Sequence, residues 1–67
     1  MKIYLQGKGF IKKSITETEM EVEPGTQLGQ LPVLLNLPAP HNLMYLVNGS
    51  IKNADAEVYD GDRIILI

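Results

Sequence analysis

Side chains capable of chemistry are scarce in this sequence. It contains no cysteine, so it can form no disulfide, no thiolate metal site and no thiol nucleophile. The single histidine, His41, follows Pro40 and has no acidic partner nearby in the sequence, which favours a solvated loop residue over a metal ligand or a general base. Neither Gly7-Lys8-Gly9 nor Asp60-Gly61-Asp62 has the full motif of a phosphate-binding loop. We therefore expect no catalysis within the chain and no bound cofactor or metal.

Four glutamates form a regular array of charge. Glu17, Glu19, Glu21 and Glu23 alternate with Thr18, Met20 and Val22, so a strand would place all four carboxylates on one face, about 7 Å apart. One interpretation is a solvated edge strand whose charges discourage aggregation. The other is an acidic rim that meets a basic patch on a partner. A metal site is disfavoured because carboxylates with this spacing diverge.

Size and composition favour one small globular domain over residues 1–67. The 67 residues are 45% hydrophobic, which is too high for a disordered chain, and the formal charge of −2 gives no reason to expect nucleic acid or an anionic membrane as a partner. No apolar run reaches the roughly 18 residues of a membrane span, and the first residues lack the apolar core of a signal peptide. We expect a soluble, cytoplasmic protein.

The first half of the chain predicts a hairpin followed by a helix. Ile3 and Leu5 alternate with Lys2, Tyr4 and Gln6, as in a strand buried on one side. Gly7 and Gly9 suit a hairpin loop, Phe10 could close the core beside it, and Ser14–Glu23 forms the returning strand. For the helix, we expect Thr26 as the N-cap, about ten residues with leucines on one side, and an end at Asn36. Gly29 and Pro32 predict a kinked or partly irregular helix.

The last third of the chain predicts strands joined by tight turns. Leu43–Val47 is apolar throughout, as in an interior strand, and Asn48-Gly49 supplies a turn into a short strand, Ser50–Lys52. A loop with one helical turn follows, in which Val58 would fill the core. A turn beginning at Tyr59 or Asp60 then leads into the last strand, which continues to Ile67.

Two motifs carry a resemblance to a known family. The run Gly25-Thr-Gln-Leu-Gly-Gln-Leu-Pro-Val-Leu-Leu-Asn-Leu-Pro38 is similar to the run that opens the helix in the ThiS/MoaD family of ubiquitin-like sulfur carriers, with Pro32 in place of a leucine and Asn36 in place of a glycine. A strand ending in Asn48-Gly49, a Gly61-Asp62 turn and a last strand resemble the closing half of these proteins. The resemblance implies an α+β, ubiquitin-like β-grasp fold. Its mixed sheet has four to five strands, the first and last are parallel neighbours at the centre, and one helix covers one face.

This fold leaves the other face of the sheet open. If Ile3 and Leu5 face the helix, Tyr4 faces outward. The resemblance to this family and to other ubiquitin-like proteins places residues of two neighbouring strands on the same face, so that one apolar patch forms beside the glutamate row: Tyr4, Met44, Leu46, Ile65 and Ile67. An exposed patch of several hundred Å² is usually an interaction site, so we expect these five residues to bind a protein partner. A terminal extension, a fused domain or a second copy of the chain could cover the patch instead, and weak self-association would use the same face.

The resemblance implies a sulfur carrier, with two alternatives. Such a carrier is adenylated on a terminal Gly-Gly by an adenylating enzyme, becomes a thiocarboxylate and donates sulfur in thiamin or molybdopterin synthesis. Its partners would be that enzyme or a subunit of cofactor synthesis. The 67 residues contain no Gly-Gly, so no site residue of that chemistry can be assigned. The first alternative is a tail-less interaction module with no role in sulfur transfer. The second is a TGS-like regulatory domain, which the acidic charge and the start at Met1 disfavour.

Overall fold

The computed structural model describes residues 1–9, 17–37 and 43–67. In these residues a five-stranded mixed sheet has the strand order β2-β1-β5-β3-β4. The strands are β1 (Lys2–Gly7), β2 (Glu17–Glu21), β3 (Tyr45–Val47), β4 (Ser50–Lys52) and β5 (Arg63–Leu66). The expectations for Phe10 and for the loop at His41 lie outside the described residues.

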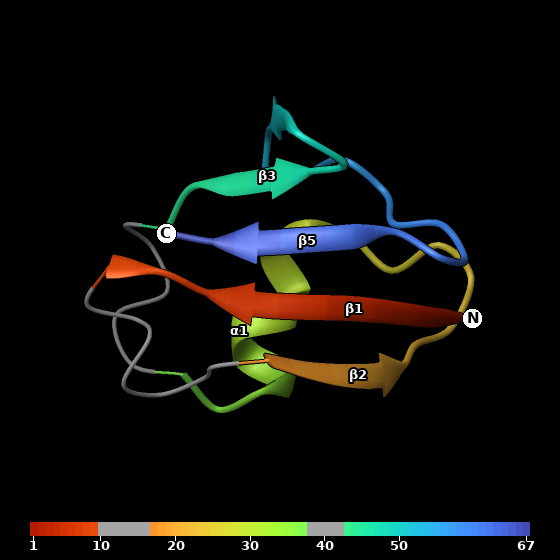
Figure 1. Cartoon of the computed structure of the whole chain (residues 1–67). Coiled ribbons are helices and arrows are strands. Elements are labelled where there is room, and N and C mark those ends of the chain that lie inside the picture. Colours follow the sequence, from red (N-terminus) through yellow and green to blue (C-terminus); the bar gives the residue numbers. More distant parts are fainter. Residues whose placement is uncertain (10–16, 38–42) are drawn as a thin grey trace.

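The two central strands come from opposite ends of the chain. β1 and β5 run parallel, with Leu5 opposite Ile64, whereas the β1–β2, β3–β5 and β3–β4 pairs are antiparallel. Figure 1 shows β1 and β5 side by side at the middle of the sheet and the helix α1 behind it. The expected β-grasp arrangement is thereby confirmed.

The core lies between the sheet and the helical segment. The inward residues of the two central strands, Ile3, Leu5, Ile64 and Leu66, are at most 2% exposed. They pack in one cluster with Leu28 and Leu31 from the helical segment and with Val58, which fills the core as expected. Burying these side chains supplies the main stabilising free energy in a chain that has no disulfide.

The helical segment is short and irregular, as Gly29 and Pro32 predicted. A 3-10 turn, η2 (Leu28–Gln30), leads into a single α-helical turn, α1 (Leu31–Leu34). Pro32 lies in the first turn of α1, where its missing amide would have no partner in any case. The carbonyl of Leu28 accepts instead from the Leu31 amide, in the 3-10 pattern. The expected length of about ten residues was therefore wrong.

The helix ends as predicted but begins one residue later. Asn36 adopts a left-handed conformation with φ of 56°, and the amides of Asn36 and Leu37 donate to the carbonyls of Val33 and Pro32, a complete Schellman motif. At the other end Gln27, not Thr26, is the N-cap. The Thr26 hydroxyl donates backwards to the Glu23 carbonyl, 2.7 Å away. It is therefore engaged in the preceding turn and does not cap the helix.

Candidate docking surface

The strand registers show which side chains share the open face of the sheet. Ile65 of β5 lies opposite Leu46 of β3, and Leu46 lies opposite Ile51 of β4. Next to this row Met44 and Ile67 form a pair in which each amide donates to the other's carbonyl, at 2.9 and 3.1 Å. We call these five residues the apolar cluster: Met44, Leu46, Ile51, Ile65 and Ile67. They lie on one face of three neighbouring strands, β3, β4 and β5, and just beyond the ends of β3 and β5.

Members of the apolar cluster are exposed to different degrees. Met44 is 48% exposed and Ile51 is 65% exposed, whereas Leu46, Ile65 and Ile67 are half-buried. Directly opposed side chains on one face of a sheet come within about 5 Å of each other, so the members in the middle cover one another in part. Met44 and Ile51 are therefore the members most available to another molecule.

Ile51 was not among the residues selected from the sequence. The signal was nevertheless present, because a two-residue turn at Asn48-Gly49 sets the hairpin register and so places Ile51 opposite Leu46. The strand expected at 50–52 therefore already implies that Ile51 shares a face with Leu46.

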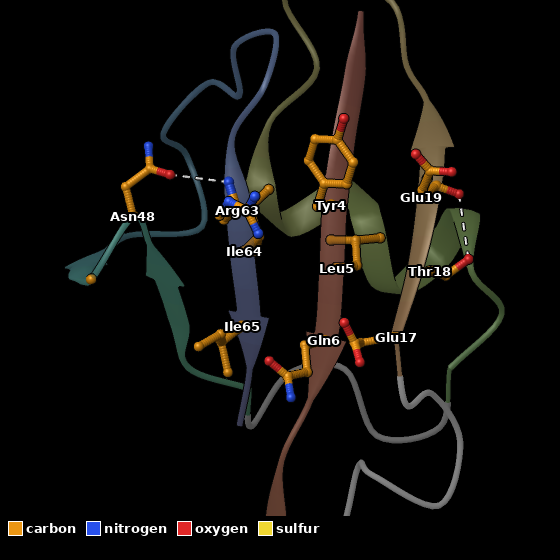
Figure 2. A pocket seen from close by; sticks show the side chains of 11 residues that line it. Tyr4, Leu5, Gln6, Glu17, Thr18, Glu19, Asn48, Arg63, Ile64 and Ile65 are labelled. Carbon is orange, nitrogen blue, oxygen red and sulfur yellow. Dashed lines mark hydrogen bonds between the residues drawn. The ribbon is translucent and has the colours of Figure 1, made fainter.

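Tyr4 lies in a different row from the apolar cluster. Its register partners are Glu19 on β2 and Arg63 on β5, while Ile65 lies opposite Gln6. The Arg63 guanidinium carbon is 5.5 Å from the centroid of the Tyr4 ring, a cation–π contact that covers part of the ring. Tyr4 is consequently 37% exposed and belongs to a polar half of the face, as Figure 2 shows. The structure therefore brings together four of the five expected residues, whereas Tyr4 lies on the same face in the neighbouring row and shares with Ile65 only the lining of a depression described below.

The glutamates of β2 border this polar half. Glu17, Glu19 and Glu21 lie opposite Gln6, Tyr4 and Lys2 and are exposed. Glu19 lies 3.7 Å from the Lys2 ammonium, and Glu21 lies 3.5 Å from the N-terminal ammonium. Exposed ion pairs of this kind contribute about 0–1 kcal/mol each to stability. The glutamates remain accessible to solvent and to another molecule.

A shallow depression lies between the glutamates and the apolar cluster. It has a volume of about 470 Å³, and its lining includes the side chains of Glu17 and Glu19 on one border, Tyr4 and Gln6 on its floor, and Ile65 toward the cluster. Figure 2 looks into it from the open side of the sheet. Arg63 and Asn48 line its other end, so the depression combines apolar, acidic and basic groups.

A polar clamp joins the β3–β4 turn to the start of β5. The Asn48 amide group donates to Asp62 at 3.1 Å, and the Asn48 side-chain oxygen accepts from the Arg63 amide at 3.0 Å. The second oxygen of the buried Asp62 carboxylate accepts from the Tyr59 amide at 2.9 Å. Asn48 holds this geometry with a φ of 51°. The clamp fixes β5 against β3 and so determines which of its residues face outward.

Within residues 1–9, 17–37 and 43–67 the structure offers few features of an active site. No group of three or more histidine, cysteine, aspartate or glutamate residues there could hold a metal ion. Burial raises the pKa of the Tyr45 phenol above its ordinary value of 10.0, on the inner side of β3 and away from the open face. No helix in this part of the chain has the length and apolar character to cross a membrane.

Known proteins resemble this chain in structure but not detectably in sequence. No family model and no curated protein matches it. SAMP1 from Haloferax volcanii has a TM-score of 0.78 at 12% identity, covering 100% of this chain and 93% of that one. A Pyrococcus furiosus protein assigned as molybdopterin converting factor, subunit 1, has a TM-score of 0.77 at 18% identity, covering 97% and 93%. A ubiquitin from Caldiarchaeum subterraneum has a TM-score of 0.67 at 24% identity, covering 100% and 90%.

These likenesses establish the fold. The chain is a ubiquitin-like β-grasp domain that matches its structural neighbours over nearly their whole length. The expected resemblance to ThiS/MoaD proteins is confirmed as a likeness of fold, because SAMP1 and the molybdopterin converting factor subunit are ubiquitin-fold proteins of that kind.

Proposed function

We propose that this chain is a ThiS/MoaD-like ubiquitin-fold protein of the cytoplasm that acts without catalysing a reaction itself, by docking onto a protein partner. The helix-opening and strand-ending motifs support the family, and the fold neighbours agree with it. The partner is an adenylating enzyme or a subunit of thiamin or molybdopterin synthesis, and the docking surface is the apolar cluster.

The position of the apolar cluster at the end of β5 carries this proposal. The Lys8 amide donates to the Leu66 carbonyl on one side of β5, and Ile67 pairs with Met44 on the other. The last residues are therefore held in the sheet up to Ile67. A terminal Gly-Gly tail, as sulfur carriers require, would leave the sheet directly beside the cluster. A partner seated on the cluster would then have the tail within reach of its active site.

Intact mass of the protein purified from its native cells tests the sulfur-carrier role. A mass several residues larger than these 67, with a fraction shifted by the exchange of oxygen for sulfur, would support a working carrier. A mass that ends at Ile67 with no thiocarboxylate would exclude it. Docking without sulfur transfer is the second candidate, because all five members of the cluster lie within residues 44–67 and need no tail to bind.

Two matched substitutions test the docking role. Ile51→Asp places a charge in the apolar cluster at a 65% exposed position, and Val33→Asp places the same charge on α1 at a 73% exposed position. We expect Ile51→Asp to weaken binding to the purified adenylating enzyme of the same cells at least about tenfold, because a carboxylate buried without a partner is costly. Val33→Asp should bind as the unchanged chain does. Equal binding by all three proteins would refute docking through the cluster.

A further inference from the structure

The open face changes character in steps from one edge of the sheet to the other. One row of register partners runs from Glu17 through Gln6 and Ile65 to Leu46 and Ile51, that is, from a carboxylate through an amide to three aliphatic side chains. A partner that covers this face must therefore be apolar on one side. On the other side it must carry groups that can pair with the carboxylates. The depression lies where the two kinds of surface meet.

We propose that the depression receives a basic side chain, an arginine or a lysine, of the protein that docks on the apolar cluster. This proposal rests on the docking function and identifies the chemistry of the partner. Glu17 and Glu19 supply carboxylates at the border of the depression, while Ile65 and the Tyr4 ring supply apolar surface for the aliphatic stem of the incoming residue. A guanidinium or ammonium group at that border can donate hydrogen bonds to the carboxylates, while the aliphatic stem of the residue is covered by Ile65 and the Tyr4 ring.

Arg63 also lines the depression, at the end where Tyr4 and Asn48 lie. Its guanidinium is drawn over the Tyr4 ring, 5.5 Å from the centroid, and β5 is separated from β2 by β1. A cation that docks at Glu17 would lie toward the other end of the depression, because Glu17 shares a row with Gln6 and Ile65, two residues along the strands from the row of Glu19, Tyr4 and Arg63. The pair of Lys2 and Glu19 is exposed and 3.7 Å apart, and such a pair is easily exchanged for one with a docked side chain.

The first test compares variants in binding to the purified adenylating enzyme of the same cells. Glu17→Gln combined with Glu19→Gln should weaken binding about three- to thirtyfold, the effect of losing two exposed ion pairs, mainly through slower association, and should reduce the salt dependence. Asp55→Asn combined with Glu57→Gln changes the net charge equally, in the segment whose carbonyls at residues 54 and 56 accept from the amides of η2. It should leave affinity and salt dependence unchanged.

The outcomes separate this inference from the docking function. If Ile51→Asp abolishes binding but the Glu17 and Glu19 changes alter neither affinity nor salt dependence, the basic residue is refuted and docking stands. If the glutamate variant and the Asp55 and Glu57 control weaken binding equally, the effect is one of net charge and the inference also fails. If Ile51→Asp binds as the unchanged chain does, docking through the apolar cluster is refuted, and the inference that rests on it is refuted as well.

A second test does not depend on any partner. N-acetyl-arginine methylamide is titrated into the whole chain and followed by amide chemical shifts, with N-acetyl-glutamine methylamide as the uncharged control. We expect saturable shifts for the arginine probe around Gln6, Glu17 and Glu19, lost in the double glutamine variant, and none for the control probe. Absence of shifts in the depression, or equal shifts with both probes, would overturn the assignment.

Discussion

Ile64 and Ile65 are adjacent, chemically identical and differently placed. Ile64 is 1% exposed in the core beneath the helical segment, whereas Ile65 is half-buried on the open face between Gln6 and Leu46. Because successive residues of a strand point to opposite faces, one isoleucine stabilises the fold and the other is available to a partner. The comparison teaches that apolar character alone does not distinguish a core residue from a docking residue in this chain. The face of the strand on which a residue lies determines whether it belongs to the core or to the docking surface.

The largest effect is expected from substituting these two residues in the same way. Ile64→Ala leaves a cavity in the core and should lower the free energy of unfolding by about 2–5 kcal/mol, a large part of the stability of so small a domain. Ile65→Ala should cost no more than about 1 kcal/mol, since it loses mainly strand propensity and partial cross-strand contact. Urea denaturation of both variants measures the difference. Similar losses would mean that the two faces are not distinct.

The Asp62 carboxylate sustains the difference between the two faces, because its clamp fixes β5 in register. Asp62→Ala leaves the Asn48 amide group and the Tyr59 backbone amide without their acceptor and should cost about 2–3 kcal/mol. Asp55→Ala, an exposed carboxylate, should change stability by less than about 0.5 kcal/mol. Thermal or urea unfolding measures both. If Asp62→Ala is as mild as the control, the register of β5 is held by strand pairing alone.

Close packing beneath the sheet gives the next prediction. A Cβ on Gly29 would lie 3.1 Å from the Ala54 Cβ and 3.2 Å from the Ala54 carbonyl oxygen, which already accepts from the Gly29 amide at 2.8 Å. Gly29→Ala should therefore destabilise by about 1–3 kcal/mol despite the better helix propensity of alanine. Adding Ala54→Gly removes one of the two contacts and should restore part of the loss. No loss in the single variant would show that the helical segment can move away from residue 54.

Much of the fold could be read from the sequence because local signals agreed with the tertiary ones. The alternation of Ile3 and Leu5, the turn at Asn48 and the left-handed Asn36 each predicted what the structure shows. The N-cap was misassigned because Thr26 suits two local hydrogen bonds, and its hydroxyl serves the turn at Glu23. The preference of threonine for such positions does not tell which of the two hydrogen bonds its hydroxyl makes.

Only part of the candidate docking surface could be predicted from the sequence. The resemblance to ubiquitin-like proteins placed Leu46 and Ile65 on one face, but the neighbours of a residue also depend on how adjacent strands are aligned. The parallel register of β1 and β5 sets Tyr4 against Arg63 and Gln6 against Ile65, and no local turn specifies it. The register of Ile51, by contrast, follows from a tight turn and could have been predicted.

The smallest effect concerns Tyr45, which lies on the inner face of β3 and is 6% exposed. Its raised pKa, caused by desolvation, means that the folded state disfavours the phenolate relative to the unfolded chain. The stabilisation is complete below the unfolded pKa of about 10 and is lost as pH rises through the higher folded pKa. Tyr45→Phe should remove this alkaline loss from urea denaturation curves recorded between about pH 8 and pH 11. Tyr59→Phe, at a 63% exposed site, retains Tyr45 and should keep it. An unchanged alkaline loss in Tyr45→Phe would show that another group on the inner side of the sheet is responsible.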